Sequence, residues 1–252
     1  MALLYVQYTS NVLSLNVSMN VLLPEHPCPR PDGLWPTLYL LHGYWGDHTD
    51  WQRRTLLERY VEGMNLAVVM PAGHNSFYTD ISRGPRYFEH ISEEVPALCE
   101  RMFPLSSKRE DRFVAGLSMG GYGAFKVALR CPGRFAAGAS LSGVMDVVGA
   151  MEEYGQERRT ERLMEAFGTA QEQRGGENDL LAVASRLIES KTPLPRLYMA
   201  CGTEDFLYEN NRSFLAAVGE PLGIVYEEGP GEHTWDFWDA YIQRVLNWLA
   251  IK

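Results

Sequence analysis

Short continuous apolar runs alternate with helical patterns from residue 37 onward, and this alternation limits the fold more than any other feature of the chain. An apolar run bounded by turn residues is typical of a strand that is buried on both faces. Helical segments between such strands are the crossover connections of a parallel sheet. The sequence therefore predicts an α/β protein with a mostly parallel central sheet and helices on both faces. We interpret five segments as parallel strands: TLYLLHG, LAVVMPAG, RFVAGLS, FAAGASLSG and PRLYMACG.

The first part of the chain follows a different pattern, with a period of two residues. In NVLSLNVSMNVLLP, apolar side chains alternate with polar ones, which indicates a half-buried strand. The preceding segment LLYVQYTS is expected to pair with it. The two strands would form an antiparallel N-terminal edge of the sheet.

Helical spacing predicts the remaining elements. TDWQRRTLLERYVEGM (residues 49–64) and YFEHISEEVPALCERMF (residues 87–103) each predict one helix, with Pro96 at a kink or in a first turn. A charged segment at about residues 144–191 predicts a helical insertion, which would be either a solvated layer or part of a pocket mouth. No domain linker is evident, so we expect residues 1–252 to form a single domain.

Composition limits the partners and the compartment. The 252 residues carry a formal net charge of −9, which argues against nucleic acid or an anionic membrane surface as the main partner. The N-terminal residues have no basic segment of a signal peptide, and no apolar stretch is long enough to span a membrane. The four cysteines are scattered without a C-x-x-C pair, which favours free thiols in a reducing compartment. We expect a cytoplasmic protein.

VAGLSMGGYGAF contains the pattern G-x-S-x-G around Ser118, between an apolar strand and a helical segment. A sharp strand-to-helix turn at this place exposes the serine hydroxyl at the carboxyl end of the strand. The alternative is a glycine-rich turn that serves packing only. The strand–turn–helix context favours Ser118 as a nucleophile.

A serine hydroxyl needs a base to take its proton, and in this architecture the chain order is serine, acid, histidine. His233 is the one histidine after Ser118, and it follows the apparent strand GIVYEE. The acid is expected after the preceding strand, where Glu204 and Asp205 stand together. We prefer Asp205 as the group that orients the imidazole, with Glu204 as the alternative.

A tetrahedral intermediate also needs hydrogen-bond donors for its oxyanion. The backbone N–H of Met119, directly after the nucleophile, is the first candidate. The second should come from the loop LLHGYWGDHTDW after an earlier strand, where Gly43 permits a close approach. We expect the N–H of Tyr44 to be this donor.

Several motifs together resemble the esterase D branch of the α/β-hydrolases, in particular the bacterial tributyrin-esterase type. The resemblance spans nearly the whole chain and implies the α/β-hydrolase fold, the triad Ser118, Asp205 and His233, and oxyanion amides at Tyr44 and Met119. It also implies hydrolysis of short-chain acyl esters from acetyl to butyryl, including acetylated sugars, without a cofactor, and a homo-oligomer in some members. The motifs are LLHGYWGDHTDW, YTDI, FEHISEEVPALCERMFP, REDRFVAGLSMGGYGAFKVAL, CGTEDFLYENN and GEHTWDFW.

Relatives within the same branch leave other substrates open. S-formylglutathione hydrolases are similar around the serine but carry a CPWG stretch after it, where this chain has SLSGVMDVVGAM. Mycolyltransferases share the architecture but are exported. Feruloyl esterase activity is a further alternative, since several aromatic residues are candidates for an acyl pocket: Tyr44, Trp45, Phe77, Tyr78, Tyr122 and Trp235.

Two hypotheses from other functional classes are alternatives to a serine esterase. A hydrolase-like scaffold could bind a ligand or partner without turnover, although an intact serine, acid and histidine in the expected order argue against it. A metal-dependent hydrolase would need clustered ligands, and the sequence contains no H-E-x-x-H pair. The sequence therefore favours a small-molecule ester as substrate, with no metal and no cofactor.

Overall fold

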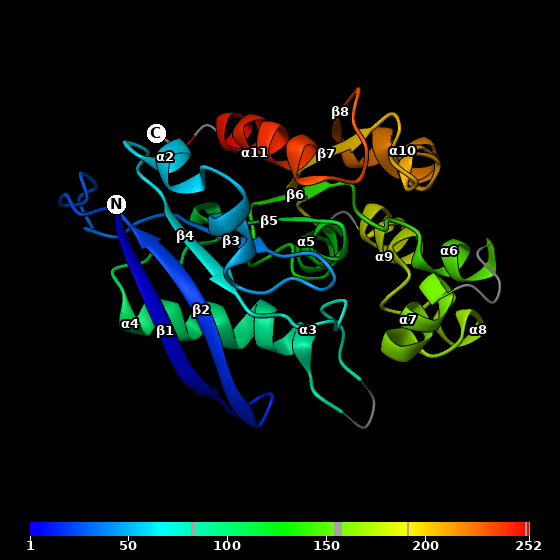
Figure 1. The fold of residues 1–252 in the computed structure, drawn as a ribbon, viewed down its shortest axis with the longest axis horizontal. Helices are drawn as coiled ribbons and strands as arrows, with labels where there is room; N and C mark the ends of the chain where they lie inside the picture. The colour runs from blue at the N-terminus through cyan, green and yellow to red at the C-terminus, as the bar shows by residue number, and fades with distance from the viewer. Residues whose placement is uncertain (82–83, 154–157, 191, 250, 252) are drawn as a thin grey trace.

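An eight-stranded sheet forms the centre of the protein, as described by a computed structural model (Figure 1). The structure describes residues 1–81, 84–153, 158–190, 192–249 and 251. The strand order is β1-β2-β4-β3-β5-β6-β7-β8, in which β1–β2 and β2–β4 are antiparallel and the other pairs are parallel. This confirms the predicted parallel sheet and its antiparallel N-terminal edge. The strands are Ala2–Ser10, Leu15–Leu23, Thr37–Leu41, Ala67–Pro71, Arg112–Leu117, Ala137–Leu141, Arg196–Gly202 and Val225–Gly229 for β1 to β8.

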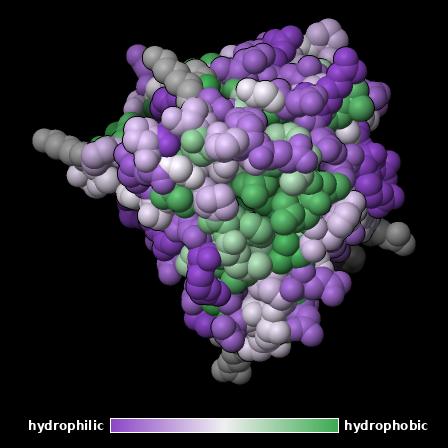
Figure 2. Space-filling model, turned by 90° about the vertical axis from the view of Figure 1, so that its left-hand side faces the viewer, coloured by the Kyte–Doolittle hydropathy of each residue, from purple (hydrophilic) through white to green (hydrophobic). Residues whose placement is uncertain are grey.

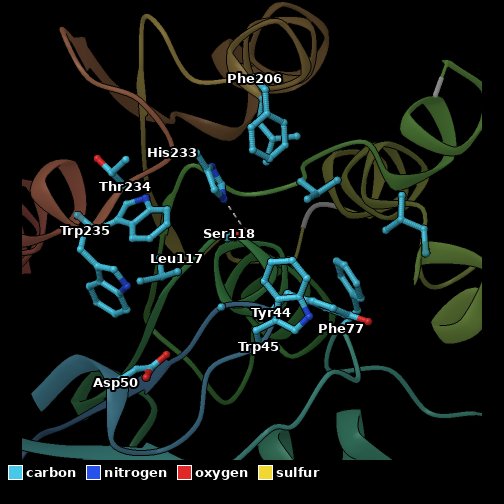
Figure 3. Close-up of a pocket in the computed structure, with 15 residues that line it drawn as sticks. Tyr44, Trp45, Asp50, Phe77, Leu117, Ser118, Phe206, His233, Thr234 and Trp235 are labelled. Atoms are coloured by element: carbon cyan, nitrogen blue, oxygen red, sulfur yellow. Dashed lines mark hydrogen bonds between the residues drawn. The ribbon is translucent and has the colours of Figure 1, made fainter. Parts of the chain in front are cut away.

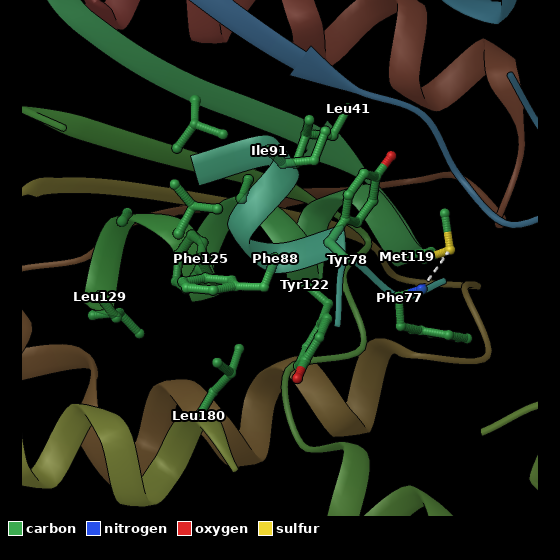
Figure 4. Packing of buried hydrophobic residues seen from close by; sticks show 14 of the residues in the cluster. Leu41, Phe77, Tyr78, Phe88, Ile91, Met119, Tyr122, Phe125, Leu129 and Leu180 are labelled. Carbon is green, nitrogen blue, oxygen red and sulfur yellow. Dashed lines mark hydrogen bonds between the residues drawn. The ribbon is translucent and has the colours of Figure 1, made fainter. Parts of the chain in front are cut away.

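The side-chain period of a strand sends its apolar residues into two separate cores. In β3, Tyr39 and Leu41 pack into one core, whereas Leu38 and Leu40 pack into the other. All five residues of this strand are buried, which explains its unbroken apolar sequence. The first core, part of which Figure 4 shows, lies under α4 (Val95–Met102), α5 (Met119–Arg130), α9 (Leu180–Glu189) and α10 (Tyr208–Leu222). The second lies under α1 (Asp50–Arg54), α2 (Leu57–Val61) and α11 (Trp235–Leu249).

Apolar side chains also reach the surface beside the N-terminal edge of the sheet. Figure 2 shows this side of the molecule, with a group of hydrophobic side chains surrounded by hydrophilic ones. Leu4 and Val6 of β1 are partly buried against the first core, as is Leu98 of α4. These residues are the exposed margin of that core.

The single helix predicted over residues 49–64 is wrong, because the segment forms two short helices, α1 and α2. Thr55 has extended backbone angles, with φ −132° and ψ 173°. Its hydroxyl donates to the carbonyl oxygen of Trp51 and accepts a hydrogen bond from the N–H of Leu57. The threonine side chain therefore replaces the backbone bonds of a continuous helix at this break.

The segment 87–103 is helical from Tyr87 to Met102 but not uniform, and Phe103 has extended backbone angles. It consists of α3 (Tyr87–Glu89), a π-helical turn (His90–Glu94) and α4, and Pro96 lies in the first turn of α4. Pro96 lies just after the π-helical turn, where the N–H of Val95 donates to the carbonyl oxygen of His90, so the N–H that proline lacks falls where the α-helical bonding pattern is already interrupted. The first-turn position predicted for Pro96 is confirmed.

Further helices lie between β6 and β7, on the right-hand side of Figure 1. They are α6 (Val147–Glu153), α7 (Arg158–Phe167), α8 (Ala170–Gln173) and α9. Residues 154–157 and 191 of the expected insertion lie outside the described residues. The assignment of residues 1–252 to a single domain stays a proposal. Across the described ranges, none of the helices combines the length and apolar character that crossing a bilayer requires.

Candidate active site

Ser118 occupies the turn between β5 and α5. Its backbone angles are φ 52° and ψ −119°, a region that non-glycine residues rarely adopt. The N–H of Ser118 donates to the carbonyl oxygen of Leu141 at 2.8 Å, which fixes the turn to the neighbouring strand β6. The side chain is half-buried and lines a pocket. The strained backbone is what a sharp strand-to-helix turn requires.

The glycines around Ser118 are needed for close backbone packing. A Cβ atom on Gly116 would lie 2.3 Å from the carbonyl oxygen of Gly120. A Cβ atom on Gly120 would lie 2.5 Å from the carbonyl oxygen of Leu41 in β3. Both clashes are with backbone, which cannot move aside as a flexible side chain can. The spacing of the motif thus follows from the contact of α5 with two strands.

His233 and Asp205 meet Ser118 at the carboxyl edge of the sheet, as Figure 3 shows for His233 and Ser118. Asp205 follows β7, and His233 lies between β8 and α11. The Nε2 atom of His233 lies 2.9 Å from the Oγ atom of Ser118. The Nδ1 atom lies 2.8 Å and 3.0 Å from the two carboxylate oxygens of Asp205. The three side chains therefore form a continuous hydrogen-bonded series.

The surroundings fix which imidazole nitrogen carries the proton. An ionised carboxylate can only accept, so Nδ1 of His233 donates to Asp205. Nε2 is then the acceptor that faces the Ser118 hydroxyl. Asp205 is buried and also accepts from the N–H of Leu207 at 2.8 Å, which holds its carboxylate in place.

Glu204, the alternative acid, points elsewhere. It is exposed, and its carboxylate accepts hydrogen bonds from the N–H of Gly231 at 2.6 Å and from the Thr203 hydroxyl at 2.7 Å. The structure gives no hydrogen bond between Glu204 and His233 within the described chain, and the geometry favours Asp205.

Aromatic rings flank the imidazole of His233 on two sides. The Phe206 ring lies 4.6 Å from it between centroids, and the Trp238 ring lies 4.9 Å away in an edge-on arrangement. Both rings line the pocket, and neither was among the predicted pocket residues. Two signals in the sequence could have found them. Phe206 directly follows Asp205, and Trp238 lies one helical turn after Trp235.

The two predicted oxyanion donors lie beside Ser118. Met119 is the first residue of α5, and a first-turn N–H has no acceptor within its own helix. Tyr44 follows Gly43, where a Cβ atom would lie 2.6 Å from Leu117 and 3.6 Å from the Cβ atom of Ser118. Tyr44 and Ser118 line the same pocket.

The pocket in front of Ser118 has a volume of about 550 Å³ and is mostly apolar. Of the six predicted aromatic residues, four line it: Tyr44, Trp45, Phe77 and Trp235. The prediction is wrong for Tyr78 and Tyr122, which are fully buried beneath the pocket. Their hydroxyls donate to the carbonyl oxygens of His42 and Asn178, respectively. Val144 and Leu163, from the segment between β6 and β7, also line the pocket, as do Asp50 and Thr234.

No three histidine, cysteine, aspartate or glutamate side chains gather as a metal site in the described ranges.

His42, at the end of β3, is a buried histidine that holds the loop leading to Tyr44. Its Nε2 atom accepts from the N–H of Gly73 at 2.8 Å, so Nδ1 carries the proton and donates to the carbonyl oxygen of Gly43 at 2.7 Å. Burial lowers the pKa of the His42 imidazole from 6.5 to about 4. The ring is therefore neutral at neutral pH.

We predict that the free energy of unfolding falls on acidification between pH 6.5 and pH 4 through His42. In this range the unfolded chain binds a proton at His42 that the folded protein does not bind. The free energy of unfolding should fall by about 3 kcal/mol over the whole range. Urea unfolding of the wild type and of His42→Gln at several pH values measures it. The variant should be less stable at pH 7 but lose less stability on acidification. His26→Gln, at an exposed histidine, is the control. Parallel curves for wild type and His42→Gln would contradict the prediction.

Known proteins with sequences similar to this chain are named as esterases. The model of the Esterase family matches residues 10–249. An acetyl esterase from Caldicellulosiruptor saccharolyticus is 34% identical, and the match covers 99% of this chain and 98% of that protein. Esterase Rv1288 from Mycobacterium tuberculosis is 36% identical over 55% of this chain and 32% of its own length.

Solved structures with the same arrangement include two from Staphylococcus aureus. The fluorophosphonate-binding serine hydrolase FphF matches with a TM-score of 0.88 and 32% identity, over 100% of this chain and 99% of that chain. The S-formylglutathione hydrolase FrmB matches with a TM-score of 0.85 and 32% identity, over 99% of each chain. A ferulic acid esterase, at 21% identity and a TM-score of 0.79 over 98% of this chain and 96% of that chain, shares the fold. The predicted α/β-hydrolase fold is confirmed.

Proposed function

The chain belongs to the Esterase family and is a serine esterase, and from this premise we propose that Ser118, His233 and Asp205 are its catalytic triad. The proposed reaction is hydrolysis of short-chain acyl esters through an acyl-enzyme. One observation carries the proposal. The hydrogen-bonded series from Asp205 through His233 to Ser118 ends at an apolar pocket of about 550 Å³.

In the acylation step, the Oγ atom of Ser118 attacks the carbonyl carbon of the ester while Nε2 of His233 takes the hydroxyl proton. Asp205 stabilises the imidazolium that forms. The N–H groups of Tyr44 and Met119 donate to the negative oxygen of the tetrahedral intermediate. The C–O bond to the alcohol then breaks, and Nε2 gives its proton to the leaving oxygen.

Deacylation repeats these roles with water as the nucleophile. His233 takes a proton from the water, whose oxygen attacks the carbonyl carbon of the acyl-Ser118, and then returns the proton to Oγ. The rings of Phe206 and Trp238 keep the imidazole partly out of bulk solvent, and only 18% of its side chain is exposed. This shielding strengthens its hydrogen bonds to Ser118 and Asp205.

The similarity to an acetyl esterase supports acetyl to butyryl esters, acetylated sugars among them, as substrates, and the pocket is large enough to hold them. We predict that kcat/KM for p-nitrophenyl esters is highest between the acetyl and butyryl esters and falls at least tenfold at the decanoyl ester. The physical reason is that the apolar wall covers a short chain, whereas the far methylene groups of a decanoyl chain must be ordered without further burial to offset the lost conformational entropy. Initial rates across the series from two to ten carbons measure this preference. A maximum at the octanoyl or decanoyl ester would contradict it.

S-formylglutathione hydrolysis is the second candidate, because FrmB is among the similar structures. Asp50 places a carboxylate in the pocket wall, and no lysine or arginine lines the described pocket. Burial raises the pKa of the Asp50 carboxyl group, and the nearby Asp47 adds to this effect. At a pH above this raised pKa, the Asp50 carboxylate repels an anionic thiol such as glutathione, so the pocket then favours esters of uncharged alcohols. Higher kcat/KM for S-formylglutathione than for every ester in the series would favour the second candidate, and the same comparison with methyl ferulate tests feruloyl esterase activity.

A further inference from the structure

Tyr78, one of the buried side chains in Figure 4, contacts His42, which lies two residues before the proposed oxyanion donor Tyr44. It is fully buried and has a φ of 50°, next to Phe77 with a φ of 49°. Two consecutive non-glycine residues in the left-handed region store strain, which the surrounding structure must offset. The Tyr78 ring fills the space over Gly73 and Gly123, where Cβ atoms would lie 2.3 Å and 2.4 Å from it. The strain and the close packing together fix this side chain in one place.

The hydroxyl of Tyr78 and the side chain of His42 hold two consecutive carbonyl groups. Tyr78 Oη donates to the carbonyl oxygen of His42 at 2.9 Å. His42 Nδ1 donates to the carbonyl oxygen of Gly43 at 2.7 Å, and the N–H of Gly46 donates to the same oxygen at 3.1 Å. In a trans peptide the C=O and the following N–H point in opposite directions. Holding the Gly43 carbonyl therefore sets the direction of the Tyr44 N–H.

Lys126 connects Tyr78 to α5, the helix whose first residue, Met119, supplies the other proposed oxyanion donor. This lysine of α5 is fully buried, and its Nζ atom donates to the Thr79 hydroxyl at 2.7 Å and to the Tyr78 carbonyl oxygen at 3.2 Å. Nζ also lies 5.4 Å and 5.5 Å from the ring centroids of Phe88 and Tyr122. Burying an amine without hydrogen-bond partners costs free energy, so loss of the bonds from Lys126 to Thr79 and Tyr78 would be unfavourable.

We propose that Tyr78, held by Lys126, is a positioning residue that sets the Tyr44 N–H relative to the Met119 N–H. It touches no substrate and acts through the His42 carbonyl. The inference rests on the proposed function, in which these two amides bind the oxyanion. Without the Tyr78 hydroxyl, the peptide between His42 and Gly43 loses its hydrogen bond, although the Gly43 carbonyl keeps its bonds to His42 Nδ1 and the Gly46 N–H. The His42 backbone and side chain can then shift together, and the Tyr44 N–H moves with them away from its best position for the oxyanion.

Tyr78→Phe tests the inference, because it removes one oxygen atom and keeps the ring. We expect kcat for p-nitrophenyl acetate to fall about 10- to 100-fold, less than for complete loss of an oxyanion donor, with KM changed less than about twofold. The affinity for a trifluoromethyl ketone, which forms an oxyanion adduct on Ser118, should weaken by the same factor as kcat. A merely structural role would lower the melting temperature without this parallel loss.

Tyr39→Phe is the matched control. Tyr39 is a buried tyrosine of β3, and its hydroxyl has no hydrogen-bond partner in the described chain. The control should keep kcat within about twofold. Equal kcat values for the Tyr78→Phe and Tyr39→Phe proteins would overturn the positioning role.

Lys126→Met gives a second route if Tyr78→Phe does not fold. It replaces the buried amine with an apolar side chain of similar length, and kcat should fall at least fivefold with KM unchanged. Unchanged kcat in the folded variant would overturn the role of Lys126. Ser118→Ala distinguishes a failure of the positioning role from a failure of the proposed function. If it abolishes activity while the Tyr78→Phe protein behaves like the control, only the positioning role fails. If it retains activity, the proposed function itself fails.

Discussion

Replacing Ser118 with alanine should lower kcat for p-nitrophenyl acetate by about five orders of magnitude or more. The variant lacks the oxygen that forms the acyl-enzyme, while the His233–Asp205 pair and the pocket stay in place. Any remaining rate comes from substrate binding and oxyanion stabilisation alone. Steady-state kinetics at high enzyme concentration, with circular dichroism to show that the variant is folded, measures the loss.

Ser142→Ala is the control for Ser118→Ala. Ser142 follows the neighbouring strand β6 and has a φ of 50°, close to the 52° of Ser118. Its hydroxyl is buried and interacts with the Cys201 thiol instead of with the triad. The control should keep kcat within about threefold, because it has the same backbone strain without contact to His233. Retention of more than a few per cent of activity by Ser118→Ala would contradict the nucleophile assignment.

Replacing Asp205 with asparagine should lower kcat by about four orders of magnitude with little change in stability. The amide keeps the shape of the carboxylate but can present an N–H to His233. The imidazole would then carry its proton on Nε2, where it cannot accept the proton of Ser118. The pH dependence of kcat on p-nitrophenyl acetate measures both the loss and any partial recovery at high pH.

Glu204→Gln tests whether the position of the carboxylate matters. Glu204 is the adjacent residue, with the same charge, and it bonds to the Gly231 N–H instead of to His233. The variant should keep kcat within about threefold. If Glu204→Gln lost more activity than Asp205→Asn, the acid would be wrongly assigned.

The strands and the order of the site residues could be predicted from the sequence because strong local signals encode them. β3 and β4 are unbroken apolar runs since both faces of the sheet are covered. Parallel strands end at one edge, so Ser118, Asp205 and His233, each after a strand, had to meet there. Gly116 and Gly120 also indicated a close contact between the strand and the helix on either side of Ser118.

The pocket lining could not be predicted so well, because it depends on how loops turn. Phe77 and Tyr78 are adjacent aromatic residues, yet the first lines the pocket and the second is buried below it. Both have positive φ angles, which nothing in a non-glycine sequence indicates. The break of the helix at Thr55 has a similar origin. Whether the threonine hydroxyl replaces the backbone bonds there depends on tertiary contacts and not on the local sequence alone.

The most direct test of the central claim is to trap the nucleophile. A fluorophosphonate forms a P–O bond with an activated serine and releases fluoride, and mass spectrometry of the intact protein and its peptides then locates the adduct. We expect one equivalent of label on the peptide that contains Ser118, in parallel with loss of esterase activity, and no label on Ser118→Ala. A fully inactivated enzyme labelled at another residue, or an active enzyme that takes up no label, would contradict the assignment of Ser118 as the nucleophile.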